Sequence, residues 1–167
     1  MTAEQIIKFF GMKPLSQEGG YYVETYRAAE QIKKAALPIN LSGDRSIATA
    51  ILYLLTADTF SAMHRLKSDE IFHFYLGDPV TMLQLHPDGR SEIITLGQDI
   101  LKSQKIQVLV PKNTWQGAFI NEGGQFALMG CTVAPGFDPD DFQQANREQL
   151  LKQYPTRKDL ITKLTRQ

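Results

Sequence analysis

Three polar side chains that could transfer protons or hold a ligand are His64, Glu70 and Gln116. His64 and Glu70 lie in the segment DTFSAMHRLKSDEIFHFYLG (58–77), and Gln116 follows in VPKNTWQGA (110–118). A histidine and a carboxylic acid can exchange protons with a substrate, whereas an amide offers both hydrogen-bond donors and an acceptor. This chemistry requires a fold that brings the three side chains into one cavity.

The stretch from residue 20 to residue 133 is predicted to form short β-strands joined by turns. Its segments are continuous apolar runs or are rich in tyrosine and β-branched residues, and glycine, proline and asparagine separate them. Many short strands spaced by turns are typical of a sandwich or barrel. The predicted strands span residues 20–27, 48–55, 60–66, 71–76, 80–86, 91–96, 106–110, 116–120 and 125–133.

Helices are predicted only toward the two ends of the chain. The first begins at the candidate N-cap Thr2 and ends at Gly11. We expect one domain over residues 1–167, with a barrel core at about 18–136 and a helical tail at about 137–167 that packs outside it. The helical patterns cover residues 2–10, 147–153 and 157–165.

Composition excludes several classes of protein. Lys+Arg and Asp+Glu are both 18, so the basic excess that is typical of nucleic-acid binding or of a polybasic membrane anchor is absent. No apolar run reaches the roughly 20 residues of a membrane helix. One cysteine, Cys131, cannot form an internal disulfide framework. We therefore expect a cytoplasmic protein whose partner is a small molecule, with neither nucleic acid nor membrane as a partner.

The two segments around the polar side chains resemble the two-motif signature of the cupin superfamily. The first cupin motif contains His-x-His, then a glutamate and a final glycine, and the second contains Pro-x-Gly-x-x-His. His64, Glu70 and Gly77 fall on the first histidine, the glutamate and the final glycine, and Pro111 falls on the proline. Gln116 stands where the last histidine would be.

Four blocks of sequence narrow the resemblance to the cupin-5 family, whose members are domains of unknown function. This resemblance implies a cupin double-stranded β-helix, or jelly-roll barrel, that is mostly β and forms a homodimer. It implies no settled activity. The fold also includes the metal-free dTDP-sugar 3,5-epimerases. The blocks are QEGGYYVETYR (17–27), HRLKSDEIFHFYLG (64–77), VPKNTWQGA (110–118) and GCTVAPGFDPDDF (130–142).

Strand alternation predicts which side chains point into such a barrel. His64 and Leu66 share one face of their strand, and in a cupin barrel this face points inward. Glu70 has the same parity as Phe72 and Phe74, so all three are predicted to face inward. His73 has the opposite parity and would face outward unless its strand is bulged. An interior lined by Leu66, Phe72, Phe74 and Met63 would raise the pKa of a carboxyl group.

The first hypothesis is metal-independent acid–base catalysis. His64 would be the base, and Glu70 would be the acid or would orient the imidazole. Tyr53 or Tyr75 could supply a second proton donor. The reaction would be the epimerisation or isomerisation of a sugar or a nucleotide-sugar.

The second hypothesis is a metal-dependent oxygenase or isomerase. His64, Glu70 and the Gln116 oxygen would then bind a divalent metal ion. Leu66 occupies the position of a second histidine ligand, so this set is shorter than the usual two imidazoles and one carboxylate. His73 completes the set only if a bulge turns it inward.

The third hypothesis is a module that binds a small ligand without turnover. Gln116 would supply an amide and Trp115 a flat surface for stacking, while Phe72, Phe74 and Tyr53 would line the site. The strand 20–27 could add Glu24 and Arg27, which a regular strand places on opposite faces. The same strand could pair with a second copy of the chain across a two-fold axis.

Overall fold

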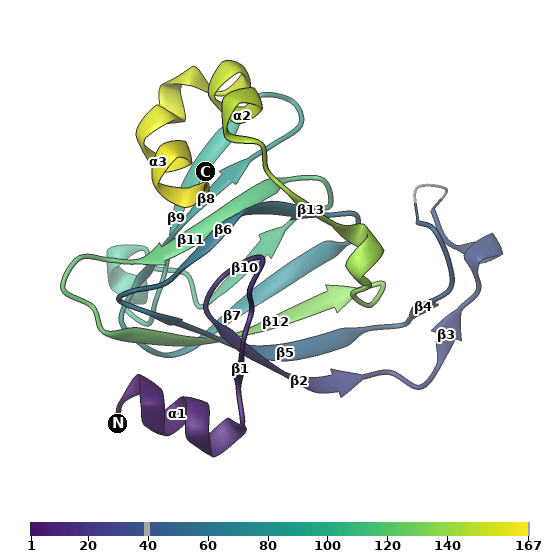
Figure 1. Cartoon of the computed structure of the whole chain (residues 1–167), viewed down its shortest axis with the longest axis horizontal. Helices are drawn as coiled ribbons and strands as arrows, with labels where there is room; N and C mark the ends of the chain where they lie inside the picture. The colour runs from purple at the N-terminus through teal and green to yellow at the C-terminus, as the bar shows by residue number, and fades with distance from the viewer. Residues whose placement is uncertain (39–40, 167) are drawn as a thin grey trace.

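Two antiparallel sheets form the body of the protein, described by a computed structural model for residues 1–38 and 41–166 (Figure 1). Each predicted strand is present, with ends that agree within two residues. The first sheet has the order β1 (Lys13–Pro14), β2 (Tyr21–Arg27), β5 (Thr49–Thr56), β12 (Phe126–Ala134), β7 (Asp69–Gly77) and β10 (Gln107–Val110). The second has the order β13 (Phe142–Gln144), β6 (Phe60–Leu66), β11 (Trp115–Ile120), β8 (Val80–Leu85) and β9 (Ser91–Leu96).

Alternating side chains fill the space between the two sheets. In β7, Glu70, Phe72 and Phe74 are buried, whereas Ile71 and His73 between them are half-buried. Tyr53 joins the same core from β5, with Met82 from β8 and Met129 from β12. The expectation of a mostly β jelly-roll barrel is therefore confirmed.

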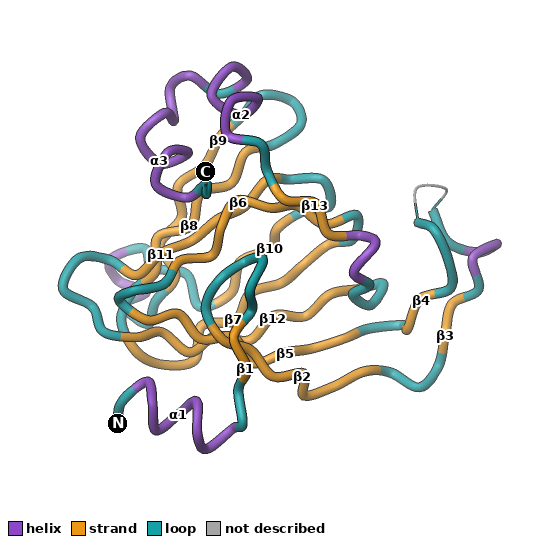
Figure 2. Tube along the Cα trace, in the orientation of Figure 1, coloured by secondary structure: helices purple, strands orange, loops and turns teal. Residues whose placement is uncertain are grey.

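Short helices cover the outer faces of both sheets (Figure 2). Helix α1 (Ala3–Phe10) begins at Thr2 with a capping box to Gln5, ends at Gly11, whose φ is +63°, and packs Ile6 against the first sheet. Helices α2 (Arg147–Gln153) and α3 (Lys158–Leu164) pack on the second sheet. No described helix combines the length and apolarity that crossing a bilayer requires. Four 3-10 turns, η1 (Lys34–Ala36), η2 (Ile100–Lys102), η3 (Pro139–Asp141) and η4 (Pro155–Arg157), complete the helical elements of the described residues.

The chain crosses one end of the barrel after β12, in a segment of residues 137–142 that we call the strap. Sequence patterns indicated helices alone beyond residue 137, but the strap leads into β13, which pairs with β6 through Phe142↔Leu66. The strand forms because it extends the edge of a sheet that is distant in sequence, and a local pattern of three residues does not reveal this.

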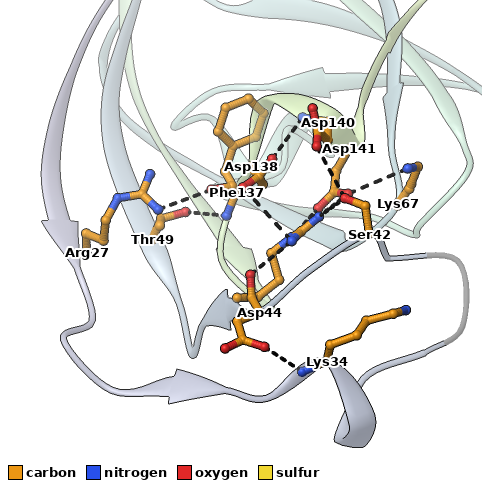
Figure 3. A network of polar contacts seen from close by, with 11 residues as sticks. Arg27, Lys34, Ser42, Asp44, Thr49, Lys67, Phe137, Asp138, Asp140 and Asp141 are labelled. Atoms are coloured by element: carbon orange, nitrogen blue, oxygen red, sulfur yellow. Dashed lines mark hydrogen bonds and ion pairs between the residues drawn. The ribbon is translucent and has the colours of Figure 1, made fainter.

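A buried ion pair holds the strap to the ribbon formed by β3 (Gln31–Ile32) and β4 (Arg45–Ser46). The Arg45 guanidinium donates two hydrogen bonds of 2.8 Å to the Asp141 carboxylate, and both side chains are at most 3% exposed. Arg27 and Thr49 hold the other end of the strap through the backbone of Phe137 (Figure 3).

Removing the buried carboxylate tests this anchoring. Asp141→Ala leaves the Arg45 charge buried and without its bidentate partner, so we expect a loss of about 3–5 kcal/mol in the free energy of unfolding. Denaturant titration followed by circular dichroism measures it. The neighbouring Asp140 is exposed, so Asp140→Ala should cost less than about 1 kcal/mol. Equal losses for the two variants would contradict the anchoring role of the ion pair.

Candidate functional site

A cavity of about 360 Å³ opens at the end of the barrel that the strap crosses. Its walls come from β2, β5, β12 and Glu70 of the first sheet, from the segment between β1 and β2, from β6 of the second sheet, and from the strap. Apolar side chains such as Leu66 and Val133 alternate with polar ones. The polar and ionisable residues of the wall are Gln17, Glu18, Tyr22, Glu24, Arg27, Thr49, His64, Glu70 and Cys131.

His64, Gln116 and Glu70 meet at the base of this cavity. Gln116 on β11 pairs in register with His64 on β6, so the two side chains lie side by side. The Gln116 amide donates a short hydrogen bond to Glu70 Oε2 on β7, and its nitrogen lies 3.3 Å from His64 Nε2. The three side chains singled out in the sequence are thus brought together, with His64 and Glu70 on the cavity wall and Gln116 behind them.

The His64 ring is held in one tautomer. Its Nδ1 lies 2.7 Å from the carbonyl oxygen of Ala62, and because a carbonyl can only accept, Nδ1 carries the proton. In the neutral ring Nε2 therefore presents a lone pair and accepts from the Gln116 amide. Phe142 of the strap stacks on the ring at a centroid distance of 5.1 Å and fixes its plane.

A second carboxylate, Glu18, reaches the same imidazole. Glu18 Oε2 lies 3.7 Å from His64 Nε2, and Oε1 accepts a hydrogen bond of 2.8 Å from Ser61 Oγ. Sequence reasoning gave Glu18 no role. Both glycines have positive φ, and a Cβ on Gly19 would lie 2.2 Å from the Phe60 carbonyl oxygen. This close approach of the two backbones brings Glu18 to the site. The Gly19-Gly20 pair is the sequence feature that could have indicated such an approach.

Burial raises the pKa of Glu70 to about 7. Loss of solvent around the carboxyl group is the main cause, and the negative charge of Glu18 acts in the same direction. His64 and the Gln116 hydrogen bond oppose the rise. Glu70 therefore keeps most of its proton below neutral pH and about half of it at pH 7, so it can donate a proton, and the rise in pKa agrees with the expectation from the apolar interior.

A β-bulge in β6 allows Ser61 and His64 to point into the same interior. Ser61 pairs with Ala118 and His64 pairs with Gln116, so β6 contains one more residue than β11 between these pairs. Gly117 lies opposite the bulge, where a Cβ would come within 2.8 Å of Met63 Sδ. Bulges occur often beside active sites, where they redirect side chains.

A similar irregularity in β2 corrects the predicted positions of Glu24 and Arg27. Simple alternation placed them on opposite faces. The register instead shifts between Glu24 and Tyr26, so that Glu24 pairs with Ile51 while Arg27 pairs with Thr49. Both side chains therefore line the cavity, and the Arg27 guanidinium donates to the Glu24 carboxylate at 3.0 and 2.7 Å.

The predicted aromatic residues lie elsewhere. Trp115 faces the opposite side of β11 from Gln116 and packs with Met63 against the C-terminal helices. Phe72 and Phe74 lie in the core between the sheets, and so does Tyr53, whose hydroxyl donates to the Gly19 carbonyl at 2.9 Å. None of these side chains belongs to the cavity wall in the described part of the chain.

Comparison with known proteins settles the family. The family model described as "Cupin superfamily (DUF985)", Cupin_5, matches residues 4–145. The chain belongs to the Cupin_5 family. A protein of solved structure from Shewanella oneidensis is 33% identical, with a TM-score of 0.87 over 99% of this chain and 98% of its own. A hypothetical protein from Leishmania major is 27% identical, with the same TM-score over the full length of both chains.

More distant cupins share the fold alone. Bacillus subtilis oxalate decarboxylase, a protein with Mn(II) centres, is 16% identical, with a TM-score of 0.53 over 93% of this chain and 38% of its own. A cupin 2 domain-containing protein from Halorhodospira halophila is 10% identical, with a TM-score of 0.54 over 89% of this chain and 84% of its own. No curated protein matches the chain.

The donor set of this cupin does not fit a metal ion. Leu66 lines the cavity at the position of the second histidine ligand, and Gln116 directs its amide nitrogen toward Glu70. His73 lies outside the barrel between Gln107 and Thr132, because β7 stays in register with β10 there and is irregular only at Tyr75. Within residues 1–38 and 41–166, no three His, Cys, Asp or Glu side chains are grouped to bind a metal.

The raised pKa of Glu70 predicts how stability depends on pH. The folded protein holds this proton up to about pH 7, whereas the unfolded chain releases it near pH 4.5. Glu70 should therefore lower the free energy of unfolding as pH rises from 4.5 to 7, by up to about 3 kcal/mol.

Glu70→Gln should remove this decline, as measured by denaturant titration across the pH range. Glu122 is exposed in a turn, so Glu122→Gln should leave the decline unchanged. A decline of equal size in Glu70→Gln would assign it to another group.

Proposed function

We propose that this cupin is a metal-independent isomerase or epimerase of a small, sugar-like molecule. The supporting observation is one cavity that contains both an imidazole whose Nε2 carries the lone pair of the neutral ring and a carboxylic acid whose pKa is about 7. A base and an acid that face the same cavity are what proton transfer at carbon requires.

The reaction begins with removal of a proton from the carbon beside a carbonyl group. The C–H bond breaks, its proton moves to His64 Nε2, and its electron pair forms the carbon–carbon double bond of an enol. The carbonyl oxygen takes the proton of Glu70. Protonated His64 then returns its proton to the neighbouring carbon, which gives the isomer, or to the same carbon after the enol has turned over in the cavity, which gives the epimer. Glu70 recovers its proton from a hydroxyl group of the enol, so both groups are restored.

Glu18 and Gln116 support this transfer from either side of the imidazole. When His64 gains a proton, the nearby Glu18 carboxylate stabilises the positive charge. Gln116 holds His64 and Glu70 in place through its amide nitrogen. Phe142 and the strap shield the imidazole from bulk water.

A second candidate function is ligand binding without turnover. Its supporting observation is that the Gln116 amide already hydrogen-bonds to both His64 and Glu70. Buried polar side chains that have no catalytic role are also paired in this way. The cavity would then bind a small molecule as most ligand sites do, through a mostly apolar wall with a few polar groups.

Exchange of carbon-bound hydrogen with solvent separates the two functions. The full-length protein is incubated in D₂O with a panel of sugars and hydroxycarbonyl compounds, and proton NMR follows loss of the signal beside the carbonyl. We expect exchange with at least one compound, and a rate that falls as Glu70 ionises above pH 7.

His64→Gln should reduce the rate by about 10²-fold or more, the usual contribution of a general base. His73→Gln is the matched control and should leave the rate unchanged, because His73 lies on the outside of the barrel. Saturable binding of a panel compound without exchange would overturn catalysis and favour the second candidate.

A further inference from the structure

We infer that the cavity takes an uncharged, hydroxylated molecule that carries no phosphate or carboxylate group. This inference rests on the proposed function and specifies the substrate class of the same site. The observations that carry it are the charges of the cavity wall and the way the cations around its mouth are already bound.

Carboxyl groups outnumber cations on the wall. Glu18, Glu24 and Glu70 line the cavity, and Arg27 is the one arginine or lysine among its described wall residues. The guanidinium of Arg27 is occupied, because it donates twice to the Glu24 carboxylate and once to the Phe137 carbonyl at 3.2 Å. The Glu24 carboxylate therefore already balances the charge that an anionic ligand would need from Arg27.

The cations beyond the mouth are also matched by carboxylates of the strap (Figure 3). The Arg45 guanidinium donates two hydrogen bonds to the Asp141 carboxylate and lies 4.0 Å from the Asp138 carboxylate. The Lys67 ammonium lies 3.8 Å from the Asp141 carboxylate. A second hollow across Phe142 likewise combines two cations with two carboxylates, namely Arg65, Lys67, Asp140 and Asp141.

An anion in this cavity would therefore lose hydration without gaining a cation that is not already paired with a carboxylate among the described wall residues. Phosphate and carboxylate groups are bound in proteins by arginine or lysine side chains or by helix N-termini, and burying an unpaired charge is costly. The Glu18 carboxylate, which lies beside His64 at the bottom of the cavity, would also repel an anion. A cationic ligand is disfavoured in turnover, because its charge would oppose formation of the imidazolium at His64.

Neutral hydroxyl groups suit the same wall. Gln17, Tyr22 and Thr49 offer neutral donors and acceptors, and Glu18 offers acceptors. The cavity volume of about 360 Å³ lies near the lower end of the roughly 300–1,000 Å³ range of ligand sites. An unphosphorylated sugar matches this size and polarity better than a nucleotide-sugar, whose diphosphate has no unpaired cation to bind.

A paired panel tests the inference on the full-length protein. Each free aldose or ketose is compared with its phosphate and with its amino-sugar, using calorimetry for binding and deuterium incorporation in D₂O for turnover. We expect binding of a free sugar to exceed that of its phosphate by at least tenfold, and exchange with a free sugar to exceed exchange with its phosphate and its amino-sugar by at least tenfold. A preference for the phosphate, a nucleotide-sugar or the amino-sugar would overturn the inference.

The same panel distinguishes the two proposals. Exchange with a sugar phosphate but not with free sugars would support proton-transfer catalysis and overturn the substrate class. Binding of free sugars without exchange would support the substrate class and overturn catalysis.

A charge variant tests whether the pairing of Arg27 with Glu24 is what excludes anions from the cavity, with inorganic pyrophosphate as the probe. Glu24→Gln removes the carboxylate that occupies Arg27, so we expect pyrophosphate to bind at least tenfold more tightly than it binds the unaltered chain. The double variant Glu24→Gln with Arg27→Gln should lose this gain, and thermal melting verifies that both variants fold. Unchanged affinity in Glu24→Gln, or equally tight binding by the unaltered chain, would overturn the inference.

Discussion

The side chain of Gln116 connects the two sheets of the barrel at the place where His64 and Glu70 are buried. Its amide belongs to the second sheet, yet it donates across the interior to Glu70 of the first sheet and lies beside His64 of its own. A buried carboxyl group without such a partner would be costly. The geometry at the bottom of the cavity therefore depends on this amide, which holds His64 and Glu70 relative to each other.

Burial and charge then determine what the two groups can do. Glu70 retains a proton to about pH 7 because solvent is excluded and because Glu18 places a negative charge nearby. The same Glu18 faces the imidazole nitrogen that remains unprotonated in the neutral ring. One carboxylate thus raises the pKa of Glu70 and also lies 3.7 Å from the imidazole nitrogen that faces it.

Irregularities in the strands shape the site as much as regular pairing does. The bulge in β6 turns Ser61 and His64 to the same interior, and the shift in β2 does the same for Glu24 and Arg27. In each case a hydrogen-bonding partner is gained, Glu18 for Ser61 and Glu24 for Arg27. Side chains three positions apart share a face only where an extra residue interrupts the alternation.

The sequence by itself determined the strands, the terminal helices, the jelly-roll family and the convergence of His64, Glu70 and Gln116, because these depend on local patterning and on spaced motifs. It could not place Glu18, the strap, or Glu24 and Arg27 on one wall, and it assigned Trp115 to a site that lies on the other side of its strand. Those features depend on bulges, on a close approach of Gly19 to Phe60, and on a strand added to a distant edge. Only the tertiary structure decides them, because contacts between residues far apart in the chain leave no periodic signal in the sequence.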